Sequence, residues 1–246
     1  MSTPHPTRSQ ALLVDLDGTL YRGDGAVLAY ARAIADSLPA AGSDRFLSIM
    51  DTYLTTGVPE PELPAGTDGW EAVRLLADRF GVERDTVAEA YLASRRALAE
   101  PECAVEVPVG LLAALRELRA GTYIVLATNS PADRLPELLA RLGAADAFDD
   151  VVPGARKPIG MPGILLGLAA RVGNTDQPWR VFSLGDHWRD DIAPARAFGA
   201  VTGYIDRFGH DDGPADVVAR DAEGILPTIL RWAADPDAFR PVAVQR

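Results

Sequence analysis

The stretch ALLVDLDGTLY, residues 11–21, decides the fold expected for this chain. It is a short apolar run that carries Asp15 and Asp17 and then meets Gly18. Short apolar runs that end in glycine are typical of buried strands in a parallel sheet. Buried carboxylates are costly unless they are paired or hold a metal, and residues two apart point to the same face of a strand. The stretch therefore predicts a strand with a functional site at its end.

Length and composition are those of an ordinary folded protein. The chain has 246 residues, 48% of them hydrophobic and 24% charged, enough for one large domain or two smaller ones. No stretch reaches the roughly 20 apolar residues of a membrane-spanning helix. Residues 1–10 lack an apolar core, so we expect a disordered tail and no signal peptide. Cys103 is the only cysteine, which excludes an intramolecular disulfide, and we expect a cytoplasmic location.

The charge of the chain limits its partners. A net charge of −11 argues against a nucleic-acid-binding protein, because such proteins usually present a basic face. An anionic substrate stays possible, because a metal ion or local cations reverse the potential in a cleft. Lysine and arginine together number 24, and Lys157 is the only lysine among them. We therefore expect a small-molecule partner, no nucleic acid and no membrane, and the oligomeric state stays open.

Residues 22–107 are expected to form a separate, all-helical domain. Apolar residues recur at helical spacing through this segment, and no strand pattern interrupts them. Ser43 or Asp44 is expected to cap the second helix, and Asp68 the third. Prolines and glycines predict a loop over 57–68. This segment reads as a block of helices inserted into another domain.

Strands and helices alternate in the remaining chain. The expected strands lie at 122–127, 151–152, 179–186, 201–206 and 216–218. The expected helices lie at 108–118, 131–142, 162–172, the segment that ends at 198, and 222–233. This alternation predicts an α/β core with a doubly wound parallel sheet, formed by 11–21 and 108–234. Residues 235–246 would be a C-terminal tail or a segment that packs along the core.

Polar side chains follow the ends of four core segments. They are Asp15 and Asp17, Thr128 and Asn129, Lys157, and Asp186 with Asp190 and Asp191. Ligands of doubly wound sheets bind outside the carboxyl ends of the strands. Carboxylates suit Mg²⁺, a lysine and a hydroxyl suit phosphoryl oxygens, and an aspartate is a possible nucleophile. The residue types are therefore coherent with a metal-assisted phosphoryl-transfer site.

The four motifs resemble those of the haloacid dehalogenase (HAD) superfamily, whose members are mostly Mg²⁺-dependent phosphatases. DLDGTLY resembles the DxDGT signature, and ATNS, Arg156-Lys157-Pro158 and LGDHWRDD match the second, third and fourth motifs in order. The resemblance covers residues 11 to roughly 205 and implies a Rossmann-like core with a helical first-type (C1) cap. One departure is visible. Relatives often read Lys-Pro-x-Pro, whereas this chain has Gly160 where the second proline would stand.

The resemblance implies catalytic roles for the first three motifs. Asp15 would be the nucleophile, and Asp17 would be the general acid and base. Thr128 would hydrogen-bond the phosphoryl group, helped by backbone N–H near Asn129. Lys157 would neutralise both Asp15 and the phosphoryl oxygens.

The resemblance also implies a Mg²⁺ site. Asp15 would contribute its carboxylate and Asp17 its backbone carbonyl. Asp186 and Asp191 would hold the metal directly or through water. Asp190 stands where relatives often carry asparagine, so its part in the metal site stays open.

The function expected from this resemblance is a Mg²⁺-dependent phosphatase. It would hydrolyse a small phosphorylated metabolite through an aspartyl-phosphate on Asp15. A 2-haloacid dehalogenase is disfavoured by Asp17, because dehalogenases of this fold lack the second acid and need no metal. A phosphomutase shares every core residue and stays open. A non-catalytic binding protein would be expected to have lost a core carboxylate or the lysine, and none is lost.

Overall fold

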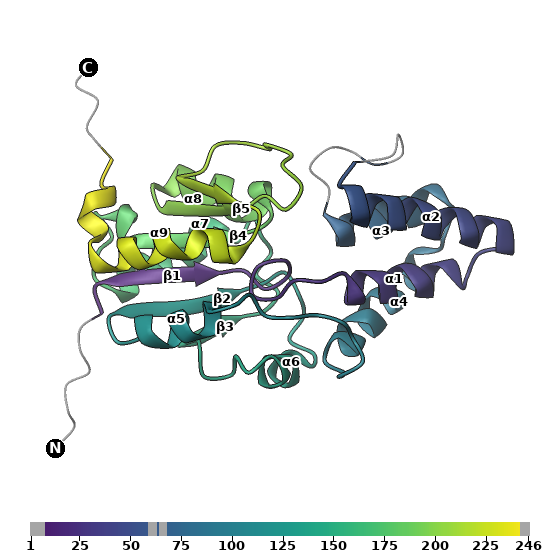
Figure 1. Cartoon of the computed structure of the whole chain (residues 1–246), viewed down its shortest axis with the longest axis horizontal. Coiled ribbons are helices and arrows are strands. Elements are labelled where there is room, and N and C mark those ends of the chain that lie inside the picture. The colour runs from purple at the N-terminus through teal and green to yellow at the C-terminus, as the bar shows by residue number, and fades with distance from the viewer. Residues whose placement is uncertain (1–7, 59–62, 64–67, 242–246) are drawn as a thin grey trace. The chain divides into compact units, whose positions relative to one another are not determined.

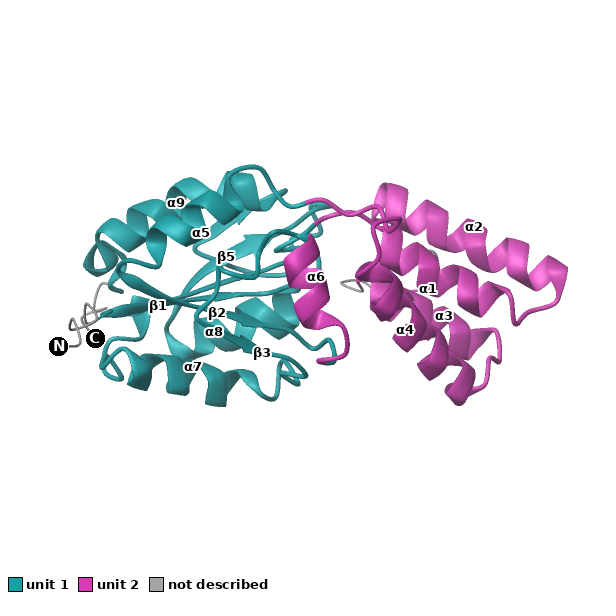
Figure 2. Ribbon diagram, turned by 90° about the horizontal axis from the view of Figure 1, so that it is seen from below, with its two compact units in different colours: residues 1–21, 107–131, 142–246 teal, residues 22–106, 132–141 magenta. Residues whose placement is uncertain are grey.

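The computed structural model describes residues 8–58, 63 and 68–241. Residues 1–7 of the tail expected over 1–10, most of the loop expected over 57–68, and the last residues, 242–246, lie outside this description. The chain divides into two compact units (Figure 2). Unit 1 consists of residues 1–21, 107–131 and 142–246, and unit 2 of residues 22–106 and 132–141.

Unit 1 is built on a six-stranded parallel sheet with the strand order β3-β2-β1-β4-β5-β6 (Figure 1). The strands are β1 (Gln10–Val14), β2 (Thr122–Ala127), β3 (Asp150–Val152), β4 (Val181–Gly185), β5 (Val201–Ile205) and β6 (Val217–Ala219). Every neighbouring pair is parallel. Parallel neighbours require long crossover connections, which place helices on the faces of the sheet. The predicted α/β fold with a doubly wound parallel sheet is confirmed.

Helices cover both faces of this sheet (Figure 2). The first layer contains α5 (Leu111–Leu118) and α9 (Ala222–Ala234), and the second contains α7 (Met161–Arg171) and α8 (Ala193–Phe198). Met161, Leu165 and Ala195 of the second layer belong to one buried apolar cluster with Leu13 of β1 and Val125 of β2. The central strand is completely buried, as expected for a strand covered on both faces.

The sheet begins one residue earlier than expected, at Gln10. The Gln10 side chain is buried and donates to Thr122 Oγ1 at 3.0 Å and to the Ala233 carbonyl at 2.8 Å. A polar side chain with satisfied donors is tolerated inside the sheet, so the strand extends past the apolar run.

The C-terminal segment expected to be a tail contains a short 3₁₀ turn, η3 (Pro236–Phe239). Asp237 of this turn accepts the Trp179 indole N–H at 3.0 Å and pairs with Arg180. These contacts dock the turn against the segment before β4, so this part of the C-terminus is folded.

In the described part of its first segment, unit 2 contains four helices: α1 (Gly25–Ala35), α2 (Ala40–Thr56), α3 (Gly69–Arg79) and α4 (Arg84–Leu98). They enclose an apolar cluster in which the rings of Tyr30, Trp70 and Tyr91 contact one another. No strand occurs in the part of residues 25–104 that the structure describes. The inserted segment is therefore helical, as expected.

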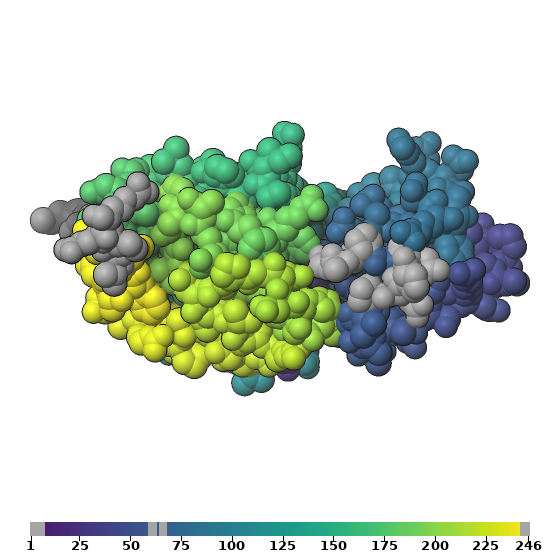
Figure 3. All heavy atoms as spheres, turned by 90° about the horizontal axis from the view of Figure 1, so that it is seen from above, coloured from purple at the N-terminus to yellow at the C-terminus, as the bar shows by residue number. Residues whose placement is uncertain are grey.

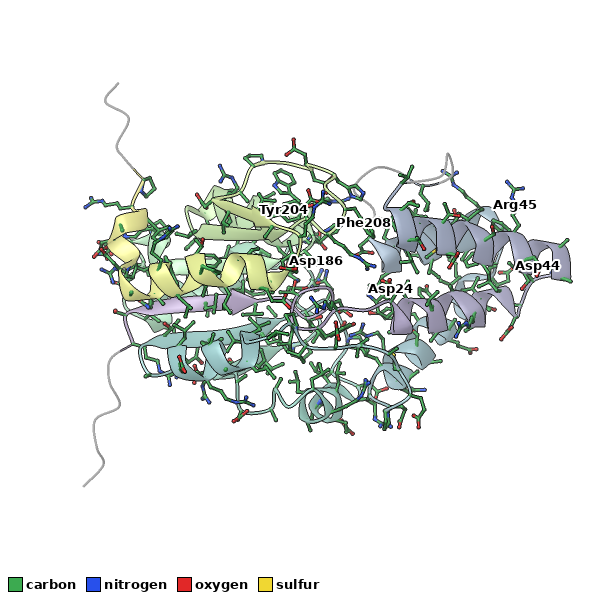
Figure 4. All side chains as sticks on the ribbon, viewed as in Figure 1. Asp24, Asp44, Arg45, Asp186, Tyr204 and Phe208 are labelled. Carbon is green, nitrogen blue, oxygen red and sulfur yellow. The ribbon has the colours of Figure 1, made fainter. Side chains whose placement is uncertain are left out.

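Helix capping in unit 2 follows the sequence only in part. The predicted cap of α3 is confirmed, because the Asp68 carboxylate accepts the Glu71 N–H at 2.6 Å. The predicted cap of α2 by Ser43 or Asp44 is wrong. The helix begins at Ala40, directly after a proline, so both residues lie inside it (Figure 4, where Asp44 is labelled). Proline is well suited to helix starts, because its missing N–H has no partner to lose there.

The two ends of the helical insertion are joined by an antiparallel bridge between Arg22 and Glu106. Each backbone N–H donates to the other residue's carbonyl, at 2.9 and 3.0 Å, and the side chains form an ion pair. Gly23 has a φ of +116°, and a Cβ there would lie 2.8 Å from the Ala104 carbonyl oxygen. A residue without a side chain is therefore required where the two segments cross.

The last helix of unit 2, α6 (Leu135–Arg141), is shorter than the helix expected over 131–142. Arg134 has a φ of +59°, a left-handed conformation that a helix does not contain. Arg141 donates to the carbonyls of Leu98 (2.6 Å) and Cys103, which ties α6 to the end of α4.

No helix in the described part of the chain combines the length and apolar character needed to cross a membrane.

The packing of α9 on the sheet gives a test of the fold. Trp232 is fully buried, its ring lies 5.4 Å from that of Phe182, and its N–H donates to the Trp179 carbonyl at 2.9 Å. We expect Trp232→Ala to lower the free energy of unfolding by about 3–5 kcal/mol, because it leaves a cavity. Trp232→Phe keeps a ring and loses the hydrogen bond, so a smaller loss of about 1–2 kcal/mol is expected. Denaturant titration measures both, and equal losses would contradict this account.

Candidate active site

The site begins where β1 ends. Asp15 directly follows the strand, and its N–H donates to the Leu184 carbonyl of β4 at 3.0 Å. The hydrogen bonding of the sheet thus continues for one residue and fixes the backbone of Asp15. Only 7% of Asp15 is exposed. The carboxylate is therefore buried and needs a partner of opposite charge.

That partner is Lys157, the only lysine of the chain. Its Nζ lies 2.5 Å from Asp15 Oδ1 and 2.5 Å from Asp191 Oδ1. All three side chains are less than 10% exposed. The ammonium therefore bridges the end of β1 and the segment before α8 in a buried ion triplet, which we define as Asp15, Lys157 and Asp191.

The triplet shifts the pKa values of its members. Burial raises the pKa of Asp15 to about 7, the charges of Asp191 and Asp17 add to this rise, and Lys157 opposes it. Burial alone would lower the pKa of Lys157, but the two adjacent carboxylates outweigh burial and raise it. Lys157 is thus fixed as a cation.

Asp15, Asp186 and Asp191 form an acidic cluster in which each residue offers a carboxylate oxygen within 4.8 Å of the others. With every group ionised, the Lys157 ammonium leaves two negative charges of this cluster uncompensated. A set of carboxylate oxygens with that excess charge fits a hard divalent cation such as Mg²⁺.

Two glycines make room for the acidic cluster. Gly18 has a φ of +75°, and a Cβ there would lie 1.8 Å from Asp186 Oδ2. Gly185 at the end of β4 is similarly close, because its Cβ would lie 2.4 Å from the Asp191 Cβ. Any side chain at either position would displace a carboxylate of the cluster.

The segment that carries Asp191 is a π-helical turn, η2 (Trp188–Ile192), which leads into α8. The N–H groups of Asp190 and Asp191 both donate to the His187 carbonyl, at 3.1 and 2.8 Å. The His187 N–H in turn donates a hydrogen bond to Asp191 Oδ2 at 3.2 Å. Such wide turns are frequent at functional sites. The sequence predicted an ordinary helix here, and its periodicity does not reveal the wide turn.

In the second motif, ATNS, the side chains of Thr128 and Asn129 make different contacts. Thr128 is buried, and its hydroxyl oxygen accepts the Ser130 N–H at 3.0 Å. Asn129 holds the lysine segment, because its Oδ1 accepts the Lys157 N–H at 2.6 Å and its Nδ2 donates to the Lys157 carbonyl at 3.0 Å. The same Nδ2 donates to Asp190 Oδ2 at 3.2 Å. The Asn129 side chain therefore orients Lys157, a contact that the sequence did not predict.

The departure from Lys-Pro-x-Pro has a local cause. A Cβ at Gly160 would lie 2.0 Å from the Ala155 carbonyl oxygen, so the loop closes tightly at this residue. The Gly160 N–H donates to the Arg156 carbonyl at 2.8 Å. With this loop the Lys157 ammonium still reaches the acidic cluster.

Two hydroxyl groups bond the carboxylate of Asp17, which is not one of the three acids of the cluster. The Tyr21 hydroxyl donates to Asp17 Oδ1, and Ser130 Oγ donates to Asp17 Oδ2 at 2.9 Å. The sequence did not single out Tyr21 or Ser130. The available signal was that both lie inside the quoted motifs, Tyr21 four residues after Asp17 and Ser130 one residue after Asn129.

The segment after β5 forms a folded loop in the same unit, yellow-green at the surface in Figure 3. Asp206 accepts the N–H groups of Gly209, His210 and Asp211 at 2.7–3.1 Å. Burial opposes ionisation of Asp206, but these donors hold its pKa below the usual value. Figure 4 labels Tyr204 on β5 and Asp186 just beyond β4. The sequence assigned no function to this loop.

Comparison with known protein families gives a match over most of the chain. The family model for haloacid dehalogenase-like hydrolases matches residues 10–199. No curated protein matches the chain significantly in sequence.

Solved structures share its fold at low identity. A HAD phosphatase from Thermococcus onnurineus is 22% identical with a TM-score of 0.55, covering 90% of this chain and 97% of its own. A predicted phosphoglycolate phosphatase from Haemophilus somnus is 18% identical with a TM-score of 0.57, covering 92% and 98%. An L-2-haloacid dehalogenase is 19% identical with a TM-score of 0.57, covering 90% and 98%.

The family model thus spans most of the chain, from β1 to the end of α8, and all four motifs lie within it. By this match the chain belongs to the haloacid dehalogenase-like hydrolases.

Proposed function

We propose that this hydrolase is a Mg²⁺-dependent phosphatase that acts on small phosphate monoesters through an aspartyl-phosphate on Asp15. The observation that carries the proposal is the buried ion triplet, in which one ammonium contacts both a potential nucleophile and an acid of the metal cluster. A second acid, Asp17, is held by hydroxyl groups beside it.

In the first step, a carboxylate oxygen of Asp15 attacks phosphorus while the bond from phosphorus to the ester oxygen breaks. Asp17 gives its proton to the leaving oxygen. The Lys157 ammonium and the Thr128 hydroxyl would bind the phosphoryl oxygens, where negative charge is spread in the transition state. The Thr128 oxygen already accepts the Ser130 N–H at 3.0 Å, so its hydroxyl can still act as a donor.

In the second step, Asp17 takes a proton from a water molecule as its oxygen attacks phosphorus. The bond between phosphorus and Asp15 breaks, which releases inorganic phosphate and restores the free carboxylate. Asp17 regains the proton that it gave away, so the cycle closes without another proton donor.

The proposed cofactor is Mg²⁺, held by the carboxylates of Asp15, Asp186 and Asp191 with the backbone carbonyl of Asp17. When bound, the ion would supply positive charge that offsets the cluster and the phosphoryl oxygens. Asp190 is bound to Asn129 in the structure, so we assign it to the support of that residue and not to the metal.

The proposed substrate is a small phosphorylated metabolite. The net charge of −11 disfavours a nucleic acid, and a single free cysteine suits the proposed cytoplasmic location. A 2-haloacid dehalogenase is the less supported alternative, because it has no use for a proton donor such as Asp17. A phosphomutase would use the same residues and would differ in passing the phosphoryl group to a second substrate hydroxyl.

Hydrolysis of p-nitrophenyl phosphate tests this function. We expect activity that requires added Mg²⁺, disappears with excess chelator, and falls to background in Asp15→Asn, because an amide cannot replace the nucleophile. Asp211→Asn, an exposed acid of the loop after β5, serves as the matched control and should keep activity. Release of halide from a 2-haloacid without metal would overturn the phosphatase proposal.

The pKa of Asp15 gives a second prediction, in metal-free protein. A raised pKa means that the native state keeps a proton that the unfolded state has lost, so Asp15 reduces stability as pH rises from about 4 to about 7. We expect the melting temperature of Asp15→Asn in chelator to exceed that of wild type by a margin that grows over this interval. Added Mg²⁺ should raise the melting temperature of wild type at pH 8 and do so less at pH 6, where the proton competes.

Asp149→Asn is the control for this pH prediction. Burial opposes ionisation of Asp149, yet Arg8 and Arg119 hold its pKa below the usual value. Its charge therefore stabilises the native state above pH 4, and Asp149→Asn should lower the melting temperature over the same interval. A rise for Asp149→Asn, or a fall for Asp15→Asn, would contradict the assigned electrostatics.

A further inference from the structure

We propose that Tyr21 and Ser130 are positioning residues that hold the Asp17 carboxylate for proton transfer. The inference rests on the proposed function, in which Asp17 acts first as an acid and then as a base. It assigns a role to two residues outside the nucleophile, the metal cluster and the lysine.

Each oxygen of the Asp17 carboxylate has its own hydroxyl donor. The Tyr21 hydroxyl donates to Oδ1, and Ser130 Oγ donates to Oδ2 at 2.9 Å. Tyr21 is 2% exposed and Ser130 is 4% exposed, whereas Asp17 is half-buried. Two buried donors thus orient a carboxylate group whose residue is still partly exposed to solvent.

The two donors come from parts of the backbone that are themselves fixed. The N–H groups of Leu20 and Tyr21 both bond the Leu16 carbonyl, which closes a turn and brings the Tyr21 hydroxyl back onto Asp17. Ser130 follows β2, its N–H donates to Thr128 Oγ1, and its carbonyl accepts the Gly154 N–H at 2.8 Å. The Asp17 carboxylate is therefore tied to both β1 and β2, and it has two bonds that resist rotation.

Hydroxyl donors suit a residue that changes its protonation state. A hydroxyl group has one donor and two acceptor sites, so by rotating it bonds either an ionised or a protonated carboxyl group. An ammonium or guanidinium would only donate and would favour the ionised form alone. Asp15, the proposed nucleophile, has such a cation in Lys157, and Asp17 has hydroxyl groups.

The proton balance leaves both hydroxyl groups unchanged. The proton of Asp17 goes to the ester oxygen as its bond to phosphorus breaks and the bond from Asp15 forms. A proton of water returns to Asp17 as the water oxygen bonds phosphorus and the bond to Asp15 breaks. Tyr21 and Ser130 accept from or donate to the carboxyl group and neither gains nor loses a proton overall.

The test compares two substrates of similar shape that differ in their need for a proton. Phenyl phosphate has a poor leaving group that requires protonation, whereas the leaving group of p-nitrophenyl phosphate departs more readily as an anion. For Tyr21→Phe and Ser130→Ala we expect kcat/KM to fall about tenfold or more with phenyl phosphate and less than about threefold with p-nitrophenyl phosphate. The fall in kcat/KM should come mainly from kcat and less from KM. Asp17→Asn should show a still larger difference between the two substrates.

Tyr123→Phe is the matched control, because it removes a tyrosine hydroxyl from the same unit on β2. Tyr123→Phe should leave the ratio of kcat/KM for phenyl phosphate to kcat/KM for p-nitrophenyl phosphate at the wild-type value. Equal losses on both substrates in Tyr21→Phe and Ser130→Ala, or no loss, would overturn the inference. Wild-type phosphatase activity that survives in Asp15→Asn would instead overturn the proposed function.

A double-mutant cycle tests the contact without relying on activity. Tyr21→Phe should lower the melting temperature of wild type, because it leaves an oxygen of Asp17 without its donor. In an Asp17→Ala background the same substitution should lower the melting temperature less, since the acceptor is already gone. The same decrease in both backgrounds would show that the Tyr21 hydroxyl and Asp17 are not coupled, and the inference would be wrong.

Discussion

The buried ion triplet of Asp15, Lys157 and Asp191 is the interaction on which the site depends. Its two 2.5 Å contacts link three segments that are far apart in the sequence. Removing the Lys157 ammonium would leave Asp15 and Asp191 buried without a countercharge, at a typical cost of about 3–5 kcal/mol for a broken buried pair, whereas apolar residues of similar volume often stabilise as well as or better than a buried ion set. An ion triplet at the end of a central strand is therefore better explained by chemistry than by stability.

The parallel sheet brings the three segments together. Asp15 follows β1, Asp191 follows its neighbour β4, and Lys157 follows β3 on the other side of β2. Because these strands are parallel, the residues beyond their carboxyl ends meet at one edge of the sheet. Gly18 and Gly185 then allow the carboxylates to approach the backbone, since a Cβ at either position would overlap Asp186 or Asp191. The site thus requires both charged side chains and glycines next to them. Gly18 makes room for Asp186, and Gly185 makes room for Asp191.

The sequence predicted the parts of this arrangement that depend on strand ends. Apolar runs followed by polar residues located Asp15, Lys157 and Asp191, because strand direction alone places them at one edge of the sheet. The sequence did not predict that the Asn129 side chain hydrogen-bonds the backbone N–H and carbonyl of Lys157. That contact depends on the path of two loops. The start of α2 was misplaced for a similar reason, because capping residues and helix-interior residues overlap in type.

The two carboxylates of the first motif show how environment separates chemical roles. Both lie on the same short stretch, yet one contacts an ammonium and the other contacts two hydroxyl groups. The Lys157 ammonium opposes the burial that raises the pKa of Asp15 and so favours the ionised form that the proposed nucleophile needs, while hydroxyl groups bond both forms of a residue that passes a proton on and takes one back. In the proposed mechanism, different neighbours give two identical side chains different tasks, as in other enzymes that use paired acids in separate roles. The contrast comes from Lys157, Tyr21 and Ser130, so the proposed mechanism depends on these residues as well as on the acids they contact.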